Sequence, residues 1–149
     1  MKYLTAGVVF SEIPDEITLE IGITNCPYKC KGCHSPFLQG NVGRELSKSE
    51  LDRLLNTNSG ITCVLFSGGD SNYHDIEEVC KYVRNYHPNI KTAWYSGREV
   101  IPQDINPDLF DYIKVGPYIA SLGGLDSPLT NQRLYKMDPL EDITYKFWK

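Results

Sequence analysis

Three of the five cysteines lie close together in the stretch "CPYKCKGCH", at Cys26, Cys30 and Cys33. Three metal chemistries fit this spacing. Cys30, Cys33 and His34 match the Cys-x-x-Cys-His pattern of covalent haem attachment. The three cysteines together with His34 have the ligand types of a closed zinc site. Cys-x3-Cys-x2-Cys can also hold three irons of a 4Fe–4S cluster and leave the fourth iron open for a small ligand.

The residues beside the cysteines favour the iron–sulfur cluster. Gly32 lies between the second and third cysteines, where a loop that folds back around a large group needs glycine. A structural zinc site takes four protein ligands. His34 is the one nearby candidate, and it directly follows Cys33, so its side chain has difficulty turning back onto the metal that Cys33 binds.

The composition is typical of a globular chain of one domain, which we place over residues 1–149. No apolar run approaches the roughly 20 residues of a membrane span, so we expect no membrane partner. The formal net charge of −4 gives no electrostatic reason to expect a nucleic-acid partner. The N-terminal stretch "MKYLTAGVVFSEIPDE" does not resemble a secretory signal, so we expect a cytoplasmic protein.

A cytoplasmic location bears on the cysteines. Covalent haem attachment generally occurs outside the cytoplasm, which weakens the haem interpretation. A reducing compartment disfavours disulfides, and five cysteines is an odd number for a disulfide framework. Cys63 lies in an apolar run and Cys80 on an apolar helix face, so we expect both to be core residues rather than ligands.

Strands and helices are expected to alternate along the chain. Apolar residues alternate with others from Ile17 to Ile23, which predicts a strand with one buried face that runs into the cysteine loop. Helices are predicted to begin at Ser47, which forms a capping box with Glu50, and near Asn72. Further strands are predicted over residues 61–66, within "IKTAWYSG" and "FDYIKVG", and as a last strand in "NQRLYKM".

This order predicts an α/β fold with a mostly parallel sheet. About five strands are too few for a closed eight-stranded barrel, so we expect a partial, open βα barrel. Ligands of parallel sheets bind beyond the carboxyl ends of the strands. Those ends carry the cysteine loop, the stretch "SGGD" at residues 67–70, "YSG" at residues 95–97, and "VG" at residues 115–116.

The cysteine motif, "SGGD" and the strand order together resemble the radical S-adenosylmethionine (SAM) superfamily. The chain is most similar to the activating enzymes of anaerobic ribonucleotide reductases, in its length, in "CKGCH", and in the order of "FSGGD", "WYSG" and "NQR". Two features depart from that pattern. Ser71 stands where the family usually has proline, and Val115-Gly116-Pro117 stands where the fourth strand commonly ends in Asp-Gly.

The resemblance implies a mechanism and a set of site residues. Cys26, Cys30 and Cys33 would bind a 4Fe–4S cluster whose fourth iron is chelated by SAM. Reductive cleavage of SAM would give methionine and a 5′-deoxyadenosyl radical, which takes a hydrogen from a backbone glycine of the large reductase subunit. A flavodoxin-like protein would donate the electron. The residues expected to contact SAM are Gly32, His34, Gly68, Gly69, Asp70, Ser96 and Gly97.

Other assignments stay open at the level of sequence. His34 could contact SAM or lie at the surface, and Tyr95, Ser96 and Gly97 could contact SAM or pack within the fold. His74 and His87 are expected to be solvated. Residues 131–133 could serve SAM, the partner surface or a hairpin. Two other functions compete: a short radical SAM enzyme acting on a small molecule, such as a deazapurine synthase, and a non-enzymatic iron–sulfur carrier or zinc-stabilised module.

Overall fold

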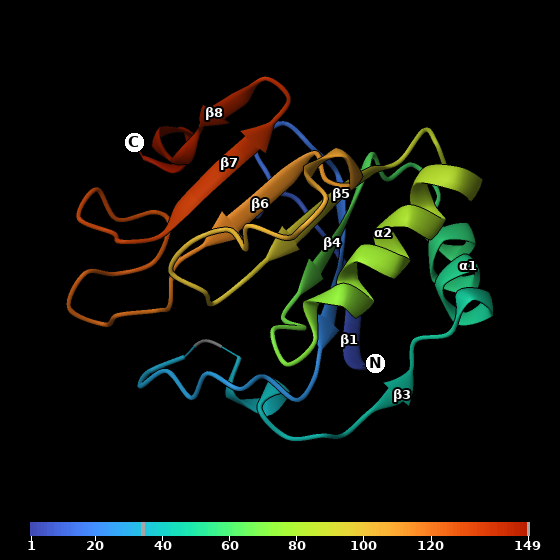
Figure 1. Ribbon diagram of the computed structural model, residues 1–149, viewed down its shortest axis with the longest axis horizontal. Coiled ribbons are helices and arrows are strands. Elements are labelled where there is room, and N and C mark those ends of the chain that lie inside the picture. Colours follow the sequence, from blue (N-terminus) through green and yellow to red (C-terminus); the bar gives the residue numbers. More distant parts are fainter. Residues whose placement is uncertain (34, 149) are drawn as a thin grey trace.

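The computed structural model describes residues 1–33 and 35–148. One eight-stranded sheet runs through the molecule in the order β3-β1-β2-β4-β5-β6-β7-β8 (Figure 1). Its four central strands pair in parallel, and all of them end on the side where the cysteine loop lies. These strands are β2 (Thr18–Ile23), β4 (Cys63–Ser67), β5 (Lys91–Tyr95) and β6 (Tyr112–Val115).

Antiparallel strands extend the sheet at both edges. They are β1 (Lys2–Val9) and β3 (Arg44–Glu45) beyond β2, and β7 (Arg133–Met137) and β8 (Leu140–Asp142) beyond β6. The sheet is therefore mixed, where the sequence predicted a mostly parallel one. The difference arises because short connections return the chain beside the strand it has just left, as between β7 and β8, and such hairpins are antiparallel.

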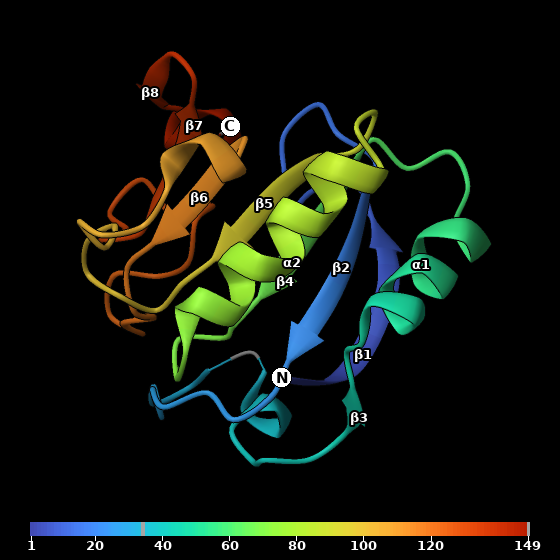
Figure 2. The same ribbon diagram turned by 45° about the vertical axis from the view of Figure 1, so that its right-hand side comes forward.

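The two helices cover one face of the sheet. Helix α1 spans Lys48–Thr57 and helix α2 spans Tyr73–Tyr86. Figure 2 shows α2 lying over the central strands, with α1 beside it toward β1. Both helices bury one apolar side against the larger core cluster of the molecule. The buried helix residues are Leu51, Leu54, Leu55, Ile76, Cys80 and Val83.

Loops and chain ends cover the opposite face only in part. A smaller buried cluster there includes Leu65 of β4, Ile13 of the β1–β2 connection, and Ile143 near the C-terminal end. Three short 3₁₀ helices lie outside the sheet, at Pro36–Leu38, Pro107–Leu109 and Thr144–Phe147. The uncovered remainder of this face opens into a cavity, and this cavity contains the candidate site. No helix in residues 1–33 and 35–148 has the length and apolar character needed to cross a membrane.

The start of α1 gives a stability prediction. The Ser47 hydroxyl accepts a hydrogen bond from the Glu50 backbone N–H at 3.1 Å, as expected of a helix N-cap. Ser47→Ala should lower the free energy of unfolding by about 1 kcal/mol. Asn72, which caps α2 without a side-chain hydrogen bond, is the matched control. Urea unfolding of both variants checks this: an Asn72→Ala loss as large as that of Ser47→Ala would contradict it.

Candidate iron–sulfur and ligand site

The cysteine loop leaves the carboxyl end of β2 and is closed by backbone hydrogen bonds. Asn25 N–H donates to the Gly40 carbonyl at 2.9 Å, and Cys26 N–H donates to the Leu38 carbonyl at 3.1 Å. Two of the described residues of the loop have positive φ, Asn25 at 63° and Gly32 at 75°, which turns the chain sharply on either side of Cys30. The loop is thus a folded structure of its own before any metal is considered.

All three cysteines of the loop are half-buried and line the same cavity. The Cys26 thiol donates to the Tyr28 carbonyl at 3.4 Å, and the Cys33 sulfur accepts from the Ser35 N–H at 3.4 Å. Burial raises the pKa of Cys26, so a metal bound there would have to displace the thiol proton. Within the described part of the chain, no group of three or more His, Cys, Asp or Glu side chains is arranged to hold a metal ion.

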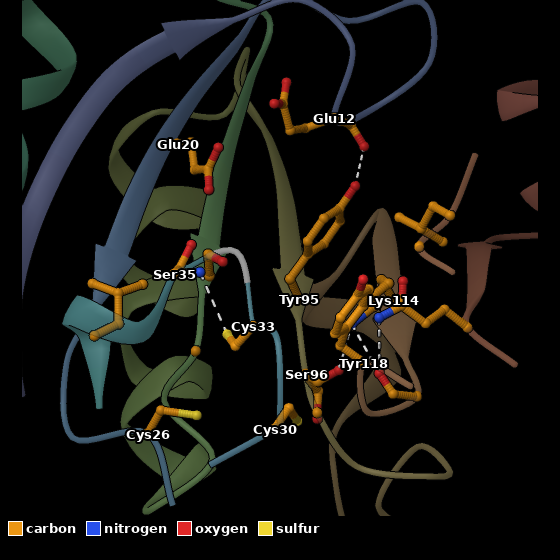
Figure 3. Close-up of a pocket in the computed structure, with 18 of the residues that line it drawn as sticks. Glu12, Glu20, Cys26, Cys30, Cys33, Ser35, Tyr95, Ser96, Lys114 and Tyr118 are labelled. Atoms are coloured by element: carbon orange, nitrogen blue, oxygen red, sulfur yellow. Dashed lines mark hydrogen bonds between the residues drawn. The ribbon is translucent and has the colours of Figure 1, made fainter. Parts of the chain in front are cut away.

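The cavity lies on the face of the sheet opposite the helices and has a volume of about 1040 Å³. Small-molecule sites commonly measure about 300–1,000 Å³, so this one has room for a large ligand or for two groups together. Figure 3 shows the cysteines at one end and Glu12 at the other, with Glu20 of β2 on one side and Tyr95 and Lys114 on the other.

Asp70 of "SGGD" is buried and uses its carboxylate to join two loops. Oδ1 accepts from the Ser96 hydroxyl at 2.6 Å, and Oδ2 accepts from the Gly97 N–H at 2.9 Å. The Arg98 guanidinium lies 3.6 Å from Oδ1 and stacks over the Tyr73 ring, 4.7 Å from its centroid. The loops after β4 and β5 are therefore held together by one charged side chain.

The structure brings four of the seven residues predicted to contact SAM to the cavity wall: Gly68, Asp70, Ser96 and Gly97. Gly32 and Gly69 are not part of that wall. Gly32 lies against the Tyr118 ring, and Gly69 packs so closely on Ile76 that a Cβ would lie 2.5 Å from Cδ1. His34 lies outside the described residues.

Gly68 has the tightest backbone surroundings at the rim. Its φ is 106°, and a Cβ would lie 2.8 Å from the Ile23 carbonyl oxygen. Its own carbonyl accepts from the Trp94 indole N–H at 2.7 Å. Any side chain at position 68 would thus be strained in conformation and in space, which explains why glycine is needed there.

Several charged or polar residues of the cavity wall lie outside the set predicted to contact SAM, among them Glu20, Lys114 and Gln132, the last of which the sequence left open. Glu20 comes from β2 and Lys114 from β6, and Gln132 precedes β7. Burial, together with the neighbouring Glu12 carboxylate, raises the pKa of Glu20. A charge within an apolar strand, as in "TLEIGI" and "YIKV", was the signal that could have identified the first two, since such residues are rarely buried without a reason.

Residues 131–133 contribute partly to contacts within the fold and partly to the cavity wall. Asn131 donates to the Pro117 carbonyl at 3.0 Å, and the Gln132 amide donates weakly to the Gly116 carbonyl at 3.5 Å. Arg133 lies 3.8 Å from Asp142 of the neighbouring strand. Of these three residues, Gln132 alone lines the cavity.

His74 is exposed beside Glu77, and His87 forms a hydrogen bond with Asp52 at 2.7 Å between the helices.

Cys63 and Cys80 are fully buried in the two core clusters, as predicted. Burial raises the pKa of both thiols far above the ordinary value, so they stay protonated and serve as small apolar groups.

A cysteine loop lies at the carboxyl edge of this mixed α/β sheet, and a family match identifies the chain as an iron–sulfur protein. The chain belongs to the family of 4Fe-4S single cluster domains, whose model matches residues 18–116. The match begins at β2, ends just after β6, and contains all three loop cysteines. No curated protein and no solved structure matches the chain significantly.

Proposed function

We propose that this iron–sulfur protein is a radical SAM activase, with the fold of a partial βα barrel. It would cleave SAM reductively at a 4Fe–4S cluster and generate the glycyl radical on the large subunit of an anaerobic ribonucleotide reductase. The observation that carries the proposal is the meeting of the cysteine loop with the "SGGD" and "YSG" loops on one cavity. The resemblance of these motifs to the radical SAM superfamily supplies the reaction.

The ligand types present are those that the cluster takes, although no three of the described His, Cys, Asp or Glu side chains are arranged around a metal ion. Three soft thiol ligands come from one pre-folded loop and line the cavity, and the chain offers no fourth cysteine beside them. Cys26, Cys30 and Cys33 would each hold one iron. When bound, the cluster would supply single electrons to a ligand at its open iron. The protein binds that ligand, orients it and excludes quenchers.

Hydrogen bonds tie the loops of the rim to one another, which suits the rim for orientation of a ligand. Asp70 fixes the Ser96 and Gly97 loop, and the Trp94 indole fixes the Gly68 carbonyl. A ligand bound here would meet backbone groups that are held in advance, which reduces the cost of ordering them. Because the Asp70 oxygens already accept two hydrogen bonds, a SAM amine would share this carboxylate with Ser96 and Gly97.

The open side of the cavity is the place for the protein partner. Radical chemistry needs a site that excludes water and stray hydrogen donors. The large reductase subunit would provide the cover by inserting its glycine-bearing segment over the rim. A flavodoxin-like protein is the proposed electron donor, and the cytoplasm is the proposed compartment.

Transfer of the radical to the partner tests the function. The reconstituted, reduced protein should cleave SAM slowly alone, and should produce a glycyl radical signal in electron paramagnetic resonance (EPR) when the large reductase subunit is added. Fully coupled turnover on a small molecule without that subunit would favour the deazapurine-synthase type of enzyme. A stable cluster with no SAM cleavage under any condition would indicate an electron carrier. Zinc in place of iron would indicate a structural module.

A further inference from the structure

Lys114 is a buried cation on β6 with no counter-charge of its own. Its residue is 9% exposed, and its ammonium donates to the Ser96 carbonyl at 3.2 Å and the Gly116 carbonyl at 2.9 Å. By contrast, Lys91 pairs with Glu16 and Lys146 pairs with Asp15, each within 3.2 Å. Among the residues that the structure describes, Lys114 forms no ion pair.

Burying such a charge is costly unless an anion compensates it. Two carbonyl dipoles and the Tyr95 ring, whose centroid lies 5.7 Å from the ammonium, compensate it in part. Burial lowers the pKa of Lys114 to about 8, while Asp70 and the three loop cysteines act in the opposite direction. At neutral pH the side chain is therefore mainly charged, and the folded protein retains a cation that no carboxylate of the described residues pairs with directly.

A compensating anion could reach Lys114 through the cavity, whose wall this residue lines. The other charged groups on its wall are Glu12, Asp15, Glu20, Asp70, Asp126 and Lys146. Of these carboxylates, Asp70 is held by Ser96, Gly97 and Arg98, and Asp15 is paired with Lys146. Glu12 lies at the far end from the cysteines (Figure 3). The cysteine end of the cavity is where negative charge arrives on loading, since three thiolates on a 4Fe–4S core leave it anionic.

We propose that Lys114 is the counter-charge of the cluster held by Cys26, Cys30 and Cys33, and that it raises the cluster's reduction potential. This inference rests on the proposed function only in requiring a cluster on those cysteines. Reduction adds one negative charge to the cluster, and a cation on the wall of the same cavity stabilises the reduced form more than the oxidised form. The low polarity around Lys114 strengthens that effect. Lys114 is thus a residue that adjusts the cluster rather than a catalytic residue.

The test is a potentiometric titration of the reconstituted cluster followed by EPR, without SAM or partner. Lys114→Met should shift the midpoint potential to more negative values, and Lys114→Arg, which keeps the charge, should restore most of the shift. Lys146→Met is the matched control, because Lys146 lines the same cavity but is already paired with Asp15, and it should leave the potential unchanged.

An unchanged potential in Lys114→Met would overturn the inference. If that variant also binds SAM more weakly, Lys114 belongs to the ligand's subsite instead. Should Lys114→Met fail to hold a cluster, Lys114→Gln keeps a polar side chain without the charge and is titrated in its place. Because the titration needs no SAM, a failure of the proposed activase function would leave its result intact.

Discussion

Replacing Cys26, Cys30 or Cys33 by alanine is expected to remove most of the cluster iron and to abolish SAM cleavage. Each cysteine would hold one iron through a thiolate, so the three cysteines have the same role. All three line the cavity from one loop, and the chain has no nearby cysteine to replace a lost one. The measurement is iron and sulfide content after anaerobic reconstitution, with methionine release as the readout of activity.

The two core cysteines are the controls for that series. Cys63→Ala and Cys80→Ala each remove a buried sulfur from a packed cluster, so they should lower stability by about 1 kcal/mol and leave cluster content and activity largely intact. A Cys26→Ala protein with a full cluster and normal SAM cleavage would contradict the ligand assignment. So would iron loss in the Cys63 or Cys80 variants while these remain folded.

Asp70→Ala is expected to weaken SAM binding by about 1.5–3 kcal/mol, the scale of a hydrogen bond to a charged group, while the cluster is retained. The structure adds a second consequence. The substitution leaves the Ser96 hydroxyl and the Gly97 N–H without their shared acceptor and the Arg98 guanidinium without its ion-pair partner, so the protein should also unfold more easily. Calorimetric SAM titration and urea unfolding measure the two effects separately.

Ser96→Ala tests whether Asp70 contacts SAM directly or only holds the neighbouring loop in position. It removes one donor to Asp70 but keeps the carboxylate and its bond to the Gly97 N–H. If Asp70 contacts SAM, Ser96→Ala should lose much less affinity than Asp70→Ala. Equal losses would mean that Asp70 acts only by holding the loop, and unchanged SAM binding in Asp70→Ala would remove it from the site altogether.

Local patterns were sufficient to predict the centre of this molecule. The strands β2, β5 and β6 lie within their predicted stretches, and β4 ends one residue beyond its own, because buried parallel strands are short apolar runs that end in glycine or a turn. Ser47 caps α1 as the sequence indicated. The common rim of the three cysteines with Gly68, Asp70, Ser96 and Gly97 follows from the rule that parallel strands carry their ligand sites beyond one edge.

The edges and the polar contacts could not be predicted in this way. In strand β1 only Tyr3 is fully buried. The sequence of this strand therefore lacks the alternation of apolar and polar residues that would predict a strand. The partners of Asp70 come from a segment 26 residues away, and no local pattern encodes that contact. The same is true of Lys114, whose burial depends on the loops that close over β6.

The most direct test of the central claim is methionine release from SAM by the anaerobically reconstituted and reduced wild-type protein, with EPR spectra of the cluster recorded before and after SAM is added. The account predicts a 4Fe–4S signal that changes when SAM binds, and methionine formation that requires both the cluster and the reductant. A cluster whose spectrum ignores SAM and which releases no methionine would contradict it.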